Sequence, residues 1–310
     1  MKVQLIQIDG KMPNLALMKI SKVHKQQGDQ VFFREVTKPN IVYISCIFTW
    51  NRSKALGIAK LFSDCEVRIG GSGINLSDIL PWHVEHAMPD YDLYGIDYSI
   101  GYTSRGCIRS CPFCVVPKKE GLIQEHAEIS EFLHPDHYKL ILLDNNFLAS
   151  PKWKEKLLEI IDRGIKVSFC QGLDIRLITQ ENARLLAESG SYDWKFKEKR
   201  WYFAFDSYSH GIWIQIQDAV KILEDAGVTA SNMMFYMLCG FDTSHKQDML
   251  RFRLLDDLGV DPFVMRYNNR RDDVWLNHFA RWVDKRIYKA CEFEEYTRLP
   301  KQFAPTTTCG

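Results

Sequence analysis

The sequence lacks three features that would narrow its function at once: an excess charge of one sign, a long apolar run and a secretory leader. Its 310 residues include 40 Lys and Arg against 39 Asp and Glu, a formal net charge of +1. That balance gives no electrostatic reason for a nucleic-acid or membrane-surface partner. No apolar stretch approaches the ~20 residues that span a bilayer. The apolar run at Met1–Asp9 meets acid and glycine too soon for a signal peptide, so we expect a cytoplasmic protein outside the membrane.

The sequence also lacks the cysteine pattern of a disulfide-bonded protein. The chain has nine cysteines, and an odd number without a secretory leader indicates reduced thiols in the cytosol. Three of them cluster as a C-x3-C-x2-C pattern at Cys107, Cys111 and Cys114. The others are scattered along the chain and predict ordinary buried or exposed thiols.

Short apolar runs alternate with helical patterns along most of the chain, which predicts an α/β fold. Residues 1–80 predict a small doubly wound, Rossmann-like domain, and residues 81–96 form a linker. Residues 97–290 alternate strand and helix six times, which predicts a partial (β/α)6 TIM-type barrel. Residues 291–310 form a C-terminal tail. Chemistry gathers at the carboxyl ends of strands in such barrels, so residues at those ends matter most.

The predicted boundaries in the second domain are specific enough to be tested. Its strands are expected at 97–103, 139–143, 166–170, 201–205, 233–238 and 262–266. Its helices are expected near 125–132, 152–163, 179–188, 212–225, 244–258 and 274–289. In the helix at 152–163, Trp153, Leu157, Ile160 and Ile161 share one face, and Gly164 ends it.

The cysteine loop directly follows the first barrel strand, and its thiols are the ligands that iron–sulfur clusters prefer. Three thiolates hold a four-iron cubane but leave one iron without a protein ligand. S-adenosylmethionine can fill that open site through its amino and carboxylate groups. An electron passed through the cluster then breaks a carbon–sulfur bond and releases a carbon radical, with the protein positioning and shielding the reactants.

A zinc site is the main alternative for these cysteines. Zinc takes four ligands, often from two C-x-x-C pairs, and the sequence offers no second pair. Zinc would suit a metal-stabilised nucleic-acid-binding module, with Arg105, Arg109, Lys118 and Lys119 on phosphates. The near-neutral charge disfavours that as the main role, although it leaves an RNA substrate open.

The segment GYTSRGCIRSCPFCVVPKKEG, residues 101–121, resembles the cluster loop of the radical S-adenosylmethionine superfamily. The likeness is greatest to members with an N-terminal cobalamin-binding-like domain and to the methylthiotransferases, and it includes DYDLYG before the loop. It implies an enzyme with a 4Fe–4S cluster on Cys107, Cys111 and Cys114. It also implies reductive cleavage of S-adenosylmethionine to a 5′-deoxyadenosyl radical, with a flavodoxin or ferredoxin as electron donor. The substrate stays unknown.

The resemblance also implies cofactor-binding residues at successive strand ends. The backbone of Phe113 would touch the adenine, and Asp144, Asn145 and Asn146 would accept the cofactor's ammonium group. An Asx turn is the alternative for these three. Gln171 and Arg176 follow the third strand, where Arg176 would either clamp the cofactor carboxylate or pair with Asp174. Asp206 would approach a ribose hydroxyl, and Gly240 would allow close backbone approach.

The role of the first domain stays open. Cobalamin-binding relatives carry D-x-H-x-x-G after their first strand, whereas this chain has DGKMPN at residues 9–14 and so lacks the cobalt-ligating histidine. A cobalamin-dependent methyltransferase is therefore an alternative, but a ligand-free domain is favoured. The Gly70–Gly73 turn fits either a ligand or an ordinary tight turn. Only Cys46 matches the second-cluster cysteines of methylthiotransferases, which disfavours methylthiolation.

Overall fold

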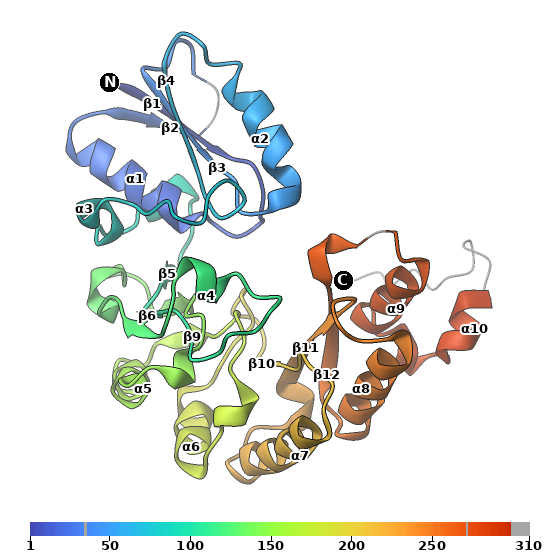
Figure 1. Cartoon of the computed structure of the whole chain (residues 1–310). Coiled ribbons are helices and arrows are strands. Elements are labelled where there is room, and N and C mark those ends of the chain that lie inside the picture. Colours follow the sequence, from blue (N-terminus) through green and yellow to red (C-terminus); the bar gives the residue numbers. More distant parts are fainter. Residues whose placement is uncertain (34–35, 271, 299–310) are drawn as a thin grey trace. The chain divides into compact units, whose positions relative to one another are not determined.

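The chain folds as a mixed α/β protein in which parallel sheets are covered by helices (Figure 1). The computed structural model describes residues 1–33, 36–270 and 272–298. The strands are β1 (Lys2–Gln7), β2 (Gln30–Phe32), β3 (Ile41–Ser45), β4 (Glu66–Gly70), β5 (Ser99–Gly101), β6 (Ser104–Arg105), β7 (Gln124–Glu125), β8 (Lys139–Leu142), β9 (Lys166–Ser168), β10 (Trp201–Ala204), β11 (Met233–Cys239) and β12 (Asp261–Arg266). The helices are α1 (Leu15–Gln26), α2 (Arg52–Ala59), α3 (Trp82–Glu85), α4 (Val116–Lys119), α5 (Trp153–Asp162), α6 (Gln180–Ser189), α7 (His210–Asp225), α8 (His245–Asp257), α9 (Val274–Asp284) and α10 (Phe293–Arg298).

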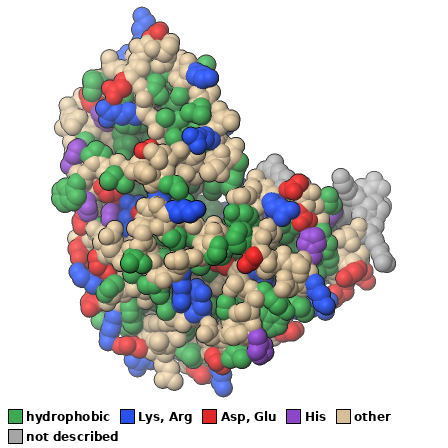
Figure 2. Space-filling view, in the orientation of Figure 1, with side chains coloured by type: hydrophobic (Ala, Val, Ile, Leu, Met, Phe, Trp, Pro, Cys, Tyr) green, Lys and Arg blue, Asp and Glu red, His purple; other side chains and the backbone are tan. Residues whose placement is uncertain are grey.

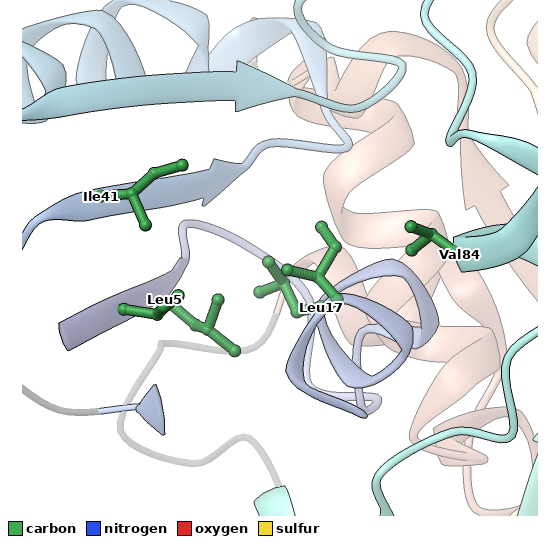
Figure 3. Close-up of a cluster of buried hydrophobic side chains, with 6 residues drawn as sticks. Leu5, Leu17, Ile41 and Val84 are labelled. Carbon is green, nitrogen blue, oxygen red and sulfur yellow. The ribbon is translucent and has the colours of Figure 1, made fainter. Parts of the chain in front are cut away.

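The first four strands form one parallel sheet in the order β2-β1-β3-β4. Side chains alternate between the two faces of a strand, so each face collects its own core. On one face Leu5 and Ile41 pack with Leu17 of α1 and with Val84 of α3 (Figure 3). On the other face Val42, Ile44 and Cys46 pack with Ala55 of α2. Helices therefore cover both faces of this sheet.

The later strands form two three-stranded sheets and one small antiparallel pair. One sheet has the order β5-β8-β9 and the other the order β10-β11-β12, while β6 pairs with β7. Leu173, just after β9, makes an isolated parallel bridge with Phe203 of β10. All six predicted strands of this part of the chain are present, each within a few residues of the expected bounds.

One predicted helix is absent, and the helix expected near 274–289 ends early, at Asp284, two residues before Arg286 with its φ of +54°. Residues 125–132 form the end of β7 and the short 3-10 turn Ile129–Glu131 instead of an α-helix. Glu125 pairs across with Ser104, and a reciprocal capping box between Glu128 and Glu131 starts the turn. The apolar spacing that suggested a helix instead buries Ile129 and Phe132, which are 1% and 3% exposed.

The C-terminal segment expected to be a tail begins with a helix, α10. The tail expected from residue 291 starts with α10, whose Phe293 lies 5.3 Å from the ring of Trp275 on α9. Phe293 and Tyr296 are both 5% exposed. The first part of the tail is therefore part of a packed aromatic core, while Cys309 lies outside the described residues.

The chain divides into two compact units. Unit 1 comprises Met1–Lys156 and Asp162–Val167, and unit 2 comprises Leu157–Ile161 and the chain from Ser168 onward. The cysteine loop belongs to unit 1. Domain boundaries at residues 80, 96 and 290 stay predictions. Within the described ranges, no helix has both the length and the apolar character needed to cross a membrane.

Candidate functional site

The cysteine loop stands on a rigid stem. Strands β6 and β7 pair antiparallel at its base, and Cys107 N–H donates to Gly121 O over 3.2 Å, which closes the loop one step further. Gly106 has a φ of +84°, and a Cβ there would lie 2.3 Å from Leu122 O. Only glycine fits this position without moving the opposite strand of the stem.

Inside the loop, backbone N–H groups point at sulfur. Arg109 N–H donates to Cys107 Sγ at 3.3 Å, and Val116 N–H donates to Cys114 Sγ at 3.5 Å. A turn bond from Cys114 N–H to Cys111 O at 3.0 Å folds the C-x2-C part, and α4 follows directly. The three thiols and Phe113 are half-buried. N–H groups aimed at sulfur are the contacts that stabilise a deprotonated or metal-bound thiol.

Three consecutive residues at the carboxyl end of β8 hold the chain that leads into the loop. Asp144 accepts four hydrogen bonds of 2.6–3.0 Å, from the backbone N–H and the hydroxyl of both Thr103 and Ser104. The next residue, Asn145, accepts the Gly106 N–H through Oδ1 at 3.0 Å. Asn146 donates from Nδ2 to Cys107 Sγ at 3.4 Å. Successive residues of the 144–146 segment therefore contact successive positions of the 103–107 segment.

This arrangement gives the Asp144–Asn146 segment a positioning role that its sequence did not reveal. Binding of the cofactor ammonium by these residues stays a prediction. Asp144 is 3% exposed and already accepts bonds from two neighbours. Asn146, also 3% exposed, differs because its Oδ1 is buried without a hydrogen-bond partner among the described residues. A buried carbonyl oxygen of this kind is expected to meet a donor, which a bound ligand would supply.

A buried lysine supports the same stem and was not predicted. Lys156 on α5 is 4% exposed and donates through Nζ to Thr103 O at 3.2 Å and to Ser150 Oγ at 3.1 Å. It also forms an ion pair with Glu125 of β7. The apolar spacing of α5 gives no signal for Lys156, because a lysine next to the buried Leu157 is expected to lie on the charged face of the helix.

A second charged cluster joins the N-terminal sheet region to the loop. Glu85 on α3 accepts from Lys19 Nζ at 3.0 Å, from Arg105 Nη1 at 3.0 Å and from His126 Nε2 at 3.1 Å. Burial alone would raise the pKa of Glu85, but these three partners outweigh it and lower that pKa to about 2. Burial lowers the pKa of Lys19. The Arg105 guanidinium also lies 4.5 Å from the ring centroid of Tyr102.

The residue types of the cysteine loop suit a metal cluster, but their side chains are not already arranged around a metal position. The loop offers three thiols, N–H groups on two of their sulfurs and a buried amide oxygen for which the described part of the chain provides no hydrogen-bond partner. Across the described ranges, however, no three His, Cys, Asp or Glu side chains are already gathered as a metal site. The predicted ligands are therefore close in sequence and share one loop without forming a preassembled site.

The remaining predicted cofactor residues lie in unit 2. Gln171 is exposed, just after β9. Arg176 binds Asp174 with Nε and Nη2 at 2.6 and 3.0 Å, which is the ion pair foreseen as its alternative. Burial raises the pKa of Asp206 to about 6, while the charge of Arg251 opposes that rise. Gly240 has a φ of +83°, and its missing Cβ leaves room for Leu276.

Sequence reasoning missed a fully buried ion pair in unit 2. Arg251 on α8 is 0% exposed and forms an ion pair of 2.6 Å with Asp248, one helical turn earlier. Its Nη1 and Nη2 donate to Phe205 O and Leu238 O at 2.6 Å each. Those carbonyls end the β10 and β11 region, so this arginine completes hydrogen bonding at the carboxyl end of the sheet. An Asp and an Arg three apart on an otherwise apolar helix face were the available signal.

At the carboxyl edge of the first sheet, the glycine turn is explained by packing. Gly71 has a φ of +102°, and a Cβ would lie 2.4 Å from Cys46 O. A Cβ on Gly73 would lie 2.7 Å from Phe48 O. Asp9 accepts the N–H groups of Ile47 and Phe48 at 2.9 and 3.0 Å. These loops therefore fill one another's space, and the turn needs its glycines whether or not a ligand binds.

Comparison with known proteins adds no assignment. A scan against models of protein families finds none that matches this chain. A search of curated proteins likewise finds no match to it. The functional argument therefore depends on the chain's own residues.

Proposed function

We propose that this chain is a radical S-adenosylmethionine enzyme, with a 4Fe–4S cluster on Cys107, Cys111 and Cys114. The proposal includes a Rossmann-like first domain and a partial barrel, formed in chain order by β5, β8, β9, β10, β11 and β12. The parallel bridge between Leu173, which follows β9, and Phe203 of β10 supports a continuous order of strands from β9 to β10. The family resemblance of residues 101–121 supports the chemistry.

One observation carries the proposal more than any other. The chain devotes three consecutive buried or half-buried side chains, Asp144, Asn145 and Asn146, to fixing residues 103–107. Such a set of hydrogen bonds is expected where Cys107 must be held in place, because a metal-binding sulfur is positioned by the residues around it and stabilised by N–H donors.

The residues have separate tasks in this proposal. When bound, the cluster supplies an electron for reductive cleavage of S-adenosylmethionine to a 5′-deoxyadenosyl radical. Asp144 and Asn145 hold the backbone that enters the loop, and Lys156 holds its stem. The residues proposed to bind the cofactor are Phe113, Asp144, Asn145, Asn146, Gln171, Arg176, Asp206 and Gly240. Asp206, whose pKa is raised by burial to about 6, is proposed to approach a ribose hydroxyl.

Anaerobic reconstitution with iron and sulfide tests the proposal. The wild-type chain should take up about four irons per chain, as expected of a cubane cluster. With a reductant and S-adenosylmethionine it should release 5′-deoxyadenosine. Single Cys107→Ala, Cys111→Ala and Cys114→Ala variants should lose the cluster. Cys65→Ala and Cys291→Ala serve as controls, because both sulfurs lie outside the loop and are also half-buried.

Three outcomes would overturn the proposal. The first is a wild-type chain that takes up no four-iron cluster. The second is a stoichiometric zinc ion on the same cysteines, which would favour a metal-stabilised nucleic-acid-binding module. The third is a reconstituted chain that binds S-adenosylmethionine without ever cleaving it. Retention of hydroxocobalamin would instead favour a cobalamin-dependent methyltransferase within the same proposal.

A further inference from the structure

The side-chain amide of Asn146 presents its nitrogen, and not its oxygen, to Cys107. Nδ2 lies 3.4 Å from Cys107 Sγ, and the residue is 3% exposed. A neutral thiol carries a proton and can donate it to a carbonyl oxygen, so it does not require this orientation. A metal-bound sulfur has no proton to donate, so it can only accept a hydrogen bond. The orientation therefore suits a sulfur that acts as a hydrogen-bond acceptor, as a metal-bound sulfur does.

The same sulfur receives a second N–H. Arg109 N–H donates to Cys107 Sγ at 3.3 Å, so one backbone and one side-chain donor converge on it. Hydrogen bonds to a ligand sulfur withdraw electron density and favour the reduced state of an iron–sulfur cluster. A backbone donor cannot be changed without moving the loop, whereas the amide of Asn146 can be replaced.

We infer that Asn146 is a positioning residue that sets the reduction potential of the cluster through its hydrogen bond to Cys107. This inference depends on the proposed function. It assigns a role to an atom, Nδ2, that the predicted binding of an ammonium group does not use, because such binding would engage the oxygen. Burial strengthens the effect, since water cannot replace the lost donor at a site that is 3% exposed.

The test compares reduction potentials rather than activity. Asn146→Leu keeps the approximate volume of the side chain and removes the donor. Asn146→Asp removes the donor and adds a negative charge beside the sulfur. Asn145→Asp is the matched control, because it adds the same charge one residue earlier and keeps an acceptor for Gly106 N–H. Each chain is reconstituted anaerobically and titrated by spectroelectrochemistry, with iron content and thermal unfolding measured in parallel.

The potential of Asn146→Leu should be more negative than that of the wild type, and that of Asn146→Asp more negative still. Asn145→Asp should shift it less than Asn146→Asp. If Asn146→Leu binds a full cluster at the wild-type potential, the inference is wrong while the proposed function stands. If the wild-type chain forms no cluster, both are wrong. Loss of the cluster in Asn146→Leu alone, with normal unfolding, would overturn the inference, because the residue would then be needed to retain the cluster rather than to set its potential.

Discussion

Glu85 Oε1 and Arg105 Nη1 lie 3.0 Å apart, which joins α3 to the strand that leads into the cysteine loop. Lys19 of α1 shares the same carboxylate. The side chain of Glu85 is 17% exposed and that of Lys19 is 7% exposed. Removing one partner of such a buried ion pair should destabilise the fold strongly, because the remaining charges stay buried without a counter-charge.

Replacing Glu85 with Gln should destabilise the chain by about 1–3 kcal/mol at pH 7. Urea denaturation measures the loss. Glu66→Gln is the control, because its pair with Arg68 is exposed on both sides and should contribute at most ~0.5 kcal/mol. Equal effects of the two substitutions would contradict a central role for Glu85.

The destabilisation by Glu85→Gln should depend on pH. Glu85 titrates at about 2 in the folded chain, below the ~4.3 of an unfolded chain. A lowered pKa stabilises the fold above the unfolded value, and that contribution is lost as pH falls from about 4.3 toward 2. The gap between wild type and Glu85→Gln should therefore shrink over that range, which a series of thermal melts would show.

Substitution of Gly71 by Ala should destabilise the first sheet by about 2–4 kcal/mol, because the new Cβ would need a positive φ and would meet Cys46 O. Gly57→Ala is the matched control. Gly57 lies within α2 with nothing near its missing Cβ, so alanine should stabilise by about 0.5–1 kcal/mol. A neutral Gly71→Ala would show that the turn has room for another group.

Asp284 should make stability fall as pH rises toward neutrality. Burial raises the pKa of its carboxyl group to about 7, against ~3.9 in an unfolded chain. Its stabilising contribution is complete below about pH 4 and is lost as pH rises through 7. Asp284→Asn cannot ionise and still accepts the Val264 N–H, which lies 2.8 Å from Oδ1.

The Asp284→Asn variant should therefore be about 1–3 kcal/mol more stable than wild type at pH 8 and nearly equal to it at pH 4. Chemical denaturation at the two pH values checks this. Asp257→Asn on the exposed side of α8 provides the comparison for loss of a surface charge. A difference that is the same at both pH values would refute the assignment.

Replacing Arg251 with Met should cost about 3–5 kcal/mol, because Asp248 would stay buried without its partner. Adding Asp248→Leu should recover part of that loss, and a double-mutant cycle in urea measures the coupling. The exposed Arg253 on the same helix gives the control, and Arg253→Met should stay within about 0.5 kcal/mol of wild type. Additive single effects would show that the pair is not coupled.

The strands and most helices were predictable because apolar periodicity is a local property. Lys139–Leu142 and Met233–Cys239 are apolar runs bounded by polar turns, and both are strands. The segment 125–132 was not predictable in this way. Its fate depends on pairing with Ser104, about twenty residues earlier, and local spacing carries no record of that partner.

The candidate site divides in the same manner. The spacing of Cys107, Cys111 and Cys114 is visible in the sequence. The matching of Asp144 to Thr103 and of Asn146 to Cys107 is not, because it requires β8 to lie beside β5 in register. The binding of a cofactor ammonium group by Asp144 stays a prediction, and the contacts that the structure gives this residue are with Thr103 and Ser104.

The hydrogen bonds from Asp144, Asn145 and Asn146 to residues 103–107 have a further consequence during synthesis of the chain. A ribosome makes the N-terminal part of a chain first, and the thiols at residues 107–114 emerge about 30 to 40 residues ahead of the residues that fix them. During that interval the loop lacks the side chains that hold it. The nascent chain is then most exposed to oxidation, so yield should depend on how oxidising the environment is while residues 107–146 are being made.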